Sequence, residues 1–163
     1  MVLLRKDGMT IGQRLADAVP YIDYIAPMVY PSHYPDNFLE YANPALYPYE
    51  VIYGSMKKGI DILASYDAQM ASTTQTASTT VTSLAHSRVN LARRLRPWIQ
   101  DFNLGTTYTP PMVRKELQAA NDAGSSGWML WNSRNIYTEK ALASTTQPSI
   151  NSLQQAASSM HNF

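Results

Sequence analysis

The sequence contains no cysteine, which excludes disulfide bonds, thiolate chemistry and zinc sites built on cysteine. It also lacks an excess of charge of one sign, because 13 Lys and Arg against 12 Asp and Glu give a formal net charge of +1. Nucleic acids and anionic membranes usually select a clustered basic excess, so neither is an expected partner. The three histidines, His33, His86 and His161, are widely spaced, and we expect neither a metal site nor a cofactor.

Long apolar runs are missing as well, and no window approaches the length needed to span a bilayer. The first ten residues, MVLLRKDGMT, lack the long apolar core and the cleavage site of a signal peptide. The sequence also has no Gly-rich phosphate loop and no nucleophile elbow. We therefore expect a soluble, globular chain, with its 163 residues in one domain, and the residues alone leave its compartment open.

The most informative stretch is residues 21–34, YIDYIAPMVYPSHY, in which an apolar run leads into an aromatic and polar loop. The apolar run predicts a strand covered on both faces, as in a parallel sheet with helices outside. Four side chains of the loop are candidates for the wall of a binding site: Tyr30, Ser32, His33 and Tyr34. The alternative is a packed loop in which backbone groups satisfy His33.

Helices and strands alternate along the rest of the chain. Apolar spacing and capping residues predict helices over 10–18, from 48 into the sixties, and over 110–123, and strands over 96–102 and 127–131. Residues 84–95 could form a short amphipathic helix, while 31–47 should be an irregular loop.

The domain organisation follows from composition. We expect one domain over 1–143, interrupted by a Ser/Thr-rich insertion at 71–83, and then a tail or terminal helix over 144–163. The insertion has few apolar side chains to bury, so it should tolerate deletion.

Each predicted strand ends in polar or aromatic side chains. Gln100 and Asp101 end the second strand, and Trp131 and Asn132 end the third. This layout is typical of a (β/α) barrel, whose active site lies at the carboxyl ends of its strands. A complete barrel has eight strands and about 250 residues, whereas only three strands are predicted here.

Four strings resemble the carboxy-terminal part of the putative glycosyl hydrolase domain family, bacterial barrels distantly similar to chitinase-like and amylase-like enzymes: IGQRLADAVPYIDYIAPMVYPSHYP, NPALYPYEVIYGSMKKGI, LRPWIQDF and AGSSGWMLWNSRNIYT. The resemblance covers about residues 10–140. It implies an α/β fold in which the predicted strands are the sixth to eighth of a (β/α)8 TIM-like barrel. It also implies that full-length members are exported or associated with the cell envelope. The family's catalytic Asp motif on its fourth strand, Asp-Tyr-Ile-Arg-Phe-Pro-like, does not occur in this sequence.

Glycoside hydrolysis normally needs two carboxyl groups flanking the scissile bond. Asp101 alone among the acids ends a buried strand, so it is the candidate catalytic residue. The alternative is a structural salt bridge or a hydrogen bond to a neighbouring loop. Six acids are interpreted as solvated helix or turn positions: Asp7, Asp17, Asp61, Glu116, Asp122 and Glu139.

Aromatic and amide side chains complete the candidate site, because carbohydrate pockets combine flat rings with hydrogen-bonding groups. The candidate substrate-binding residues are Tyr30, Ser32, His33, Tyr34, Gln100, Trp131 and Asn132. Trp131 and Tyr30 would stack on sugar rings, whereas Trp98 and Trp128 are expected to pack in the core, either on the barrel exterior under helices or in its interior layers.

Two functional hypotheses follow. The first is a glycoside hydrolase, or part of one, that acts on a polysaccharide with Asp101 as one of its carboxylates. The second is a non-catalytic carbohydrate-binding or structural half-barrel from a truncated reading frame. In either case we expect the isolated chain to be inactive. We also expect it to need an amino-terminal half-barrel as a partner or to self-associate through open sheet edges.

Overall fold

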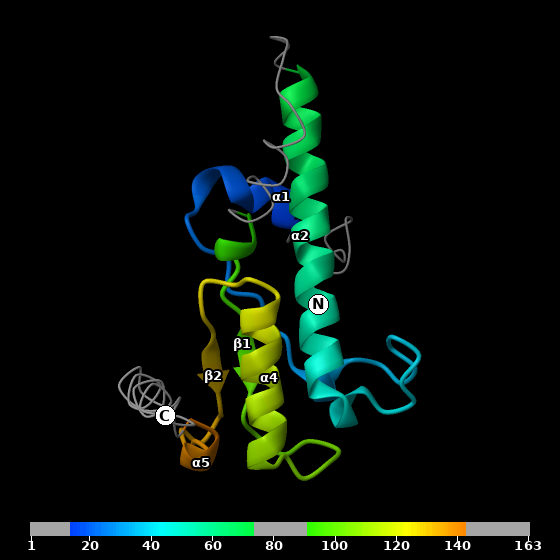
Figure 1. Ribbon diagram of the computed structural model, residues 1–163, viewed down its shortest axis with the longest axis vertical. Coiled ribbons are helices and arrows are strands. Elements are labelled where there is room, and N and C mark those ends of the chain that lie inside the picture. Colours follow the sequence, from blue (N-terminus) through cyan, green and yellow to red (C-terminus); the bar gives the residue numbers. More distant parts are fainter. Residues whose placement is uncertain (1–13, 74–90, 143–163) are drawn as a thin grey trace, which may run out of the picture.

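The computed structural model describes residues 14–73 and 91–142 (Figure 1). Several predictions fall outside these residues: the first part of the helix expected over 10–18, the first part of that over 84–95, most of the 71–83 insertion, and the tail over 144–163. Within the described ranges, none of the helices has the length and apolar character that a membrane span requires.

The described part of the chain contains a small parallel sheet. Strand β1 (Trp98–Gln100) pairs in parallel with β2 (Met129–Trp131). The segment 24–30 lies along the other edge of β1 and is joined to the strand region by parallel bridges at Ile25 and Met28. The three segments predicted to be strands are therefore adjacent, parallel and in chain order.

The described helices range from four residues to 26 residues in length. They are α1 (Leu15–Ala18), α2 (Pro48–Thr73), α4 (Pro110–Asp122) and α5 (Glu139–Leu142), with 3-10 turns at Val19–Tyr21, Pro31–His33 and Pro44–Leu46. The predicted starts at Pro48 and Pro110 are confirmed. Proline suits the first helical turn because its ring presets the φ angle. Gly124 follows α4 with a φ of +82°, the left-handed conformation of a helix terminator.

The helices cover one face of the sheet. Side chains alternate between the two faces of a strand, so Ile99 and Leu130 point to one side, and Trp98 and Trp131 to the other. Ile99 is fully buried in a core that includes side chains of α2 and α4, two helices that pack against each other (Figure 1). On the opposite face, Met28 is 65% exposed and Trp131 is 44% exposed.

The burial expected for the first strand is therefore wrong for most of its length. Tyr21 is 85% exposed and Tyr24 55% exposed, whereas only Val29 and Tyr30 near the end of the segment are buried. The physical reason is that helices cover a single face and β1 covers a single edge among the described residues.

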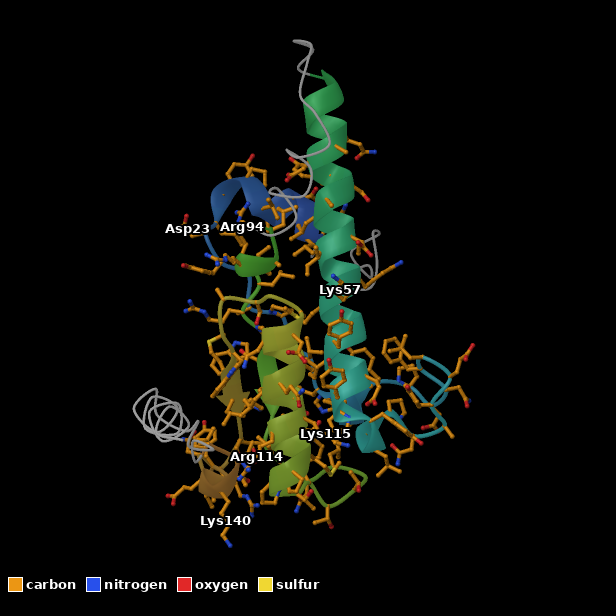
Figure 2. All side chains as sticks on the ribbon, in the orientation of Figure 1. Asp23, Lys57, Arg94, Arg114, Lys115 and Lys140 are labelled. Atoms are coloured by element: carbon orange, nitrogen blue, oxygen red, sulfur yellow. The ribbon has the colours of Figure 1, made fainter. Side chains whose placement is uncertain are left out.

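The start of this segment is held by Arg94. Its guanidinium donates hydrogen bonds to the backbone carbonyls of Val19 and Ile22, and to that of Asp23 at 3.4 Å (Figure 2). Because a guanidinium offers five donors in a rigid fork, one side chain can satisfy several carbonyls of a turn. The loop over 31–47 is irregular, as predicted, apart from its short 3-10 turns.

We predict that Ile99→Ala lowers the free energy of unfolding by about 2–5 kcal/mol, because it leaves a cavity in the core. Met28→Ala, on the uncovered face, should lower it by roughly 0.5 kcal/mol or less. Denaturant unfolding of both variants measures the two values. Equal losses would contradict the one-sided coverage of the sheet.

Candidate functional site

The carboxyl ends of the three parallel segments meet at one edge of the sheet. Tyr30 ends the first segment, and Gln100 of β1 lies beside Trp131 of β2 in the register. Seven of the eight candidate site residues lie in or directly after these ends: Tyr30, Ser32, His33, Gln100, Asp101, Trp131 and Asn132. The structure thus brings them to one edge, while their roles stay predictions.

Gln100 ties two of these ends together. Its Oε1 accepts hydrogen bonds from the backbone N–H of Ser32 at 3.2 Å and from the Ser32 hydroxyl at 2.8 Å. Its Nε2 donates to the carbonyl of Phe102 at 2.9 Å. The side chain is fully buried. These partners occupy Oε1, so Gln100 chiefly fixes the loop after the first segment against β1.

An aromatic cluster lies beside this link. The ring of Tyr30 meets the rings of His33 and Phe102 edge-on, with centroids 5.3 and 5.5 Å apart, and His33 lies 5.8 Å from Phe102. Burial, followed by the negative charge of Glu116, raises the pKa of Tyr30 to about 12. The sequence analysis missed Phe102, although it follows Asp101 directly at the strand end.

Asp101 is buried and bonded to the loop that follows β2. Its Oδ2 accepts the backbone N–H of Thr138 at 2.7 Å, and its Oδ1 accepts the Thr138 hydroxyl at 2.6 Å. The side-chain amide of Asn132 donates to the Asp101 carbonyl. The hydrogen bond to a neighbouring loop, considered above as the alternative role of Asp101, is therefore present, and it holds the start of α5.

A cavity of about 180 Å³ opens next to Asp101. Asp101 and Asn132 line it, as do Tyr108, Arg134 and Tyr137, which the sequence analysis did not single out. They come from loops after β1 and β2. Parallel α/β folds place their ligand sites at the carboxyl ends of the strands, so this cavity is the candidate site.

A larger cavity, of about 520 Å³, lies at the opposite end of the first segment. Val19, Tyr66 and Arg94 are among the residues that line it. It lies away from the carboxyl ends of the strands, and backbone carbonyls already bind the guanidinium of Arg94. The distance of this cavity from the strand ends and the occupied guanidinium of Arg94 both favour the smaller cavity as the candidate site.

The interpretation of Glu116 from the sequence is wrong. It was expected on a solvated helix face, but it is fully buried between α4 and β1. Its Oε2 accepts the backbone N–H of Gln100 at 2.7 Å, and its Oε1 accepts the hydroxyl of Tyr108. One signal could have located it, because Glu116 lies three residues after the buried Val113, on the same helix face.

The surroundings of Glu116 favour its neutral form. Burial raises the pKa of this carboxyl group well above its usual range, and the negative charge of Asp101 raises it further. The hydrogen bonds from Tyr108 and Gln100 act in the opposite direction but do not cancel the effect of burial. Tyr108 has a raised pKa as well, caused by its own burial and then by the charge of Glu116.

Tyr34 does not lie with the other candidates. Its ring is buried in the core, and its hydroxyl is 2.7 Å from the Ser55 hydroxyl of α2. Tyr34 directly follows the 3-10 turn Pro31–His33, and its backbone N–H donates to the carbonyl of Pro31. Burial raises its pKa to about 12, although the Ser55 hydrogen bond opposes the shift. This placement gives Tyr34 a packing role rather than contact with a ligand at the cavity.

The remaining tryptophans differ from each other. Trp128 packs against the core, as expected. Trp98 lies on the uncovered face, where its ring meets that of Trp131 edge-on, with centroids 6.0 Å apart. In the stretches 14–73 and 91–142, no three His, Asp or Glu side chains are grouped to hold a metal ion.

We predict that Glu116 makes the protein less stable as pH rises. Its pKa is higher in the folded protein than the ordinary value of 4.5, so the folded state binds more protons. The free energy of unfolding should therefore fall as pH rises above that value toward the folded pKa. Glu116→Gln removes this titration, so the stability of the variant relative to wild type should increase with pH. Denaturant unfolding from acidic to neutral pH measures it.

The exposed Glu40 provides the matched control for this prediction. Glu40→Gln should keep the fall of stability with pH that Glu116 causes, because Glu40 lies in an exposed loop and the Glu116 carboxyl group stays in place. A Glu116→Gln profile parallel to wild type would contradict the neutral, buried carboxyl group.

Comparison with known proteins identifies the family of the chain. Neither a curated protein nor a solved structure matches the chain. One family model, described as "Putative glycosyl hydrolase domain", matches residues 1–137. That match covers most of the 163 residues and confirms the resemblance noted in the sequence. The chain therefore belongs to the putative glycosyl hydrolase domain family.

Proposed function

We propose that this chain forms part of a glycoside hydrolase site that acts on a polysaccharide, with Asp101 as one of its carboxylates. The observation that carries the proposal is the position of Asp101 beside a cavity at the carboxyl end of a parallel sheet. Asn132 and Trp131 lie at the same edge. A carboxylate, an amide and a flat ring are the groups that carbohydrate sites combine.

The hydrogen bonds of Asp101 favour one of the two roles that glycoside hydrolysis requires. Both of its oxygens accept hydrogen bonds from Thr138, so the group is held in place as an acceptor. An acceptor of this kind suits the base or the nucleophile of the reaction rather than the acid. The proton donor must then be another group.

Trp131 supports binding of a sugar ring. Its side chain is 44% exposed, and Trp98 supports it edge-on, which leaves ring surface open to a ligand. Sugar rings present C–H groups on their faces, which pack on the apolar faces of aromatic rings, while their hydroxyls bind amides such as Asn132.

We also propose that the three parallel segments are the sixth to eighth strands of a (β/α)8 TIM-like barrel. Helices cover one face of the sheet, and the opposite face carries the exposed Met28 and Trp131. In a barrel this uncovered face would be the interior, packed against further strands. The cavity of about 180 Å³ is also below the roughly 300 Å³ at which ligand pockets usually begin, as expected of a partial site.

One observation favours the second hypothesis, a non-catalytic carbohydrate-binding or structural half-barrel. The same two hydrogen bonds from Thr138 give Asp101 a structural task, which is to fix the loop before α5. Substitutions can separate this task from catalysis, because Thr138 can be changed without removing the carboxylate.

We predict that Asp101→Asn, in a protein that contains the complete barrel, lowers turnover of a glycan by about 100-fold or more while binding changes little. Asparagine keeps the size of the side chain and one acceptor oxygen. Thr138→Val is the matched control, because it removes the hydroxyl bond to Oδ1 and leaves the carboxylate in place. Initial rates and calorimetric binding of the same glycan measure the two effects. Equal losses of turnover in both variants would favour the structural role.

We further predict that the 163-residue chain alone hydrolyses no polysaccharide at a measurable rate and gains activity when further barrel strands are supplied in the same polypeptide. The reason is that the described segments leave open strand edges and an uncovered apolar face. Glycan hydrolysis assays of the two proteins test this. Turnover by the short chain alone would contradict the barrel proposal.

A further inference from the structure

Arg134 is the only basic residue among the described residues that line the candidate cavity. It lies in the loop after β2, and the proposed function gives it no role so far. Its side chain is exposed. Within residues 14–73 and 91–142, no carboxylate, carbonyl or aromatic ring binds its guanidinium. The cavity wall therefore carries a positive charge that the described part of the fold does not use.

Other arginines of the described ranges have partners in the fold. Arg94 donates to backbone carbonyls of the first segment, and Arg114 donates to the carbonyl of Lys140 (Figure 2). A guanidinium offers five donors in a planar fork and stays charged in proteins. An arginine that lines a cavity with these donors unused can bind a charged group of a ligand.

The backbone that carries Arg134 is held in a turn. The N–H of Arg134 donates to Oδ1 of Asn132 at 2.9 Å, and the N–H of Asn135 donates to the carbonyl of Asn132 at 3.1 Å. Asn135 has a φ of +54°, in the left-handed region that asparagine adopts more readily than most residues. Asn132 also donates to the carbonyl of Asp101, which ties the turn to the end of β1. These bonds fix the position of the Arg134 backbone in the cavity wall.

Asp101, the acidic residue of the same cavity, has partners other than Arg134. Both of its oxygens accept hydrogen bonds from Thr138, and among the described residues no ion pair joins it to Arg134. Two opposite charges thus line one small cavity without pairing. A polysaccharide of acidic sugars can use both, because every ring carries its own carboxylate. One carboxylate can bind Arg134 while the bond to be cleaved lies at Asp101.

We propose that Arg134 binds the carboxylate of a sugar unit, and that the substrate of this site is an acidic polysaccharide built from uronic acids. The inference rests on the proposed hydrolase function and names its substrate class. A planar carboxylate accepts two parallel hydrogen bonds from a guanidinium, with charge on both partners. A neutral sugar presents a hydroxymethyl group at the same position, which binds without charge. Arg134 thus selects the acidic sugar, while Asn132 and the half-exposed Tyr137 bind either kind.

Matched ligands test the charge of the sugar by itself. Each pair consists of a uronic acid tetrasaccharide and the same tetrasaccharide with its carboxyl groups reduced to hydroxymethyl groups. Galacturonate, mannuronate and guluronate tetramers supply three ring geometries. Calorimetry with the protein that contains the complete barrel should show at least one acidic tetramer binding about 10-fold or more tightly than its reduced form. The difference should shrink as salt concentration rises, because salt screens exposed charges.

Substitutions test the residue. Arg134→Gln should lower the affinity for the acidic tetramer by about 10-fold or more and leave that for the reduced tetramer unchanged. Arg134→Lys keeps the charge but loses the planar fork, so its affinity should fall between the two. Arg93→Gln is the matched control, because Arg93 is also exposed, precedes the amino end of β1 and is not among the residues that line the cavity. Its variant should bind both tetramers as wild type does.

Three binding results would overturn the inference. They are no binding of any acidic tetramer, equal binding of each acidic tetramer and its reduced form, and an Arg134→Gln variant that does not selectively lose affinity for the acidic tetramer. An equal loss for both ligands would show that Arg134 serves a carboxylate of the complete barrel instead.

Hydrolysis assays of the same protein separate this inference from the proposed function. If the wild-type protein prefers an acidic tetramer but cleaves no glycan, the hydrolase proposal fails and the acidic-sugar site belongs to the non-catalytic hypothesis. If it cleaves neutral glycans and shows no preference for acidic ones, the hydrolase proposal stands and the role of Arg134 fails.

Discussion

Strand β1 is hydrogen-bonded to a neighbour along each of its edges, and the site depends on these bonds. The Trp98 N–H donates to the carbonyl of Pro27 at 2.9 Å, and on the other edge the Met129 N–H donates to that of Pro97 at 2.9 Å. Parallel pairing on both sides points three distant segments in the same direction. Their carboxyl ends therefore coincide, which brings Tyr30, Gln100 and Trp131 to one edge without any contact that is local in sequence.

The carboxyl group of Glu116 accepts a backbone hydrogen bond of β1 at the point where the pairing of β1 with the first segment stops. Hydrogen bonds of a strand alternate in direction, so the N–H of Gln100 points the same way as that of Trp98. The neighbouring segment has already turned away into a 3-10 turn, and the Glu116 carboxyl group accepts the bond instead. A buried side-chain carboxyl group thus satisfies a backbone N–H at the end of β1 that no strand neighbour accepts. Because the same carboxyl group contacts Tyr108, the end of β1 is linked to the wall of the cavity.

Among the described residues, helices cover only one face of the sheet, and the proposed barrel accounts for the face left open. Ile99 faces the helices and is fully buried, whereas Met28 on the opposite face is largely exposed. Parallel sheets usually have both faces covered, because their crossover connections place helices on the faces. The uncovered face and the small cavity beside it have the same explanation in the proposal, in which both belong to the inside of a larger barrel.

The sequence by itself determined the local elements and the family. Pro48, Pro110 and Gly124 act on their own backbone, so the starts of α2 and α4 and the end of α4 followed from the residue types. The positions of the strand ends, and with them Asp101, followed from apolar runs that stop at polar residues. Only the tertiary structure decided the environments of these side chains: the burial of Glu116, the Thr138 partner of Asp101, and the packing of Tyr34 against α2. The reason is that charge, burial and hydrogen bonding depend on neighbours that are 8 to 37 residues away in the chain, and no local pattern specifies them.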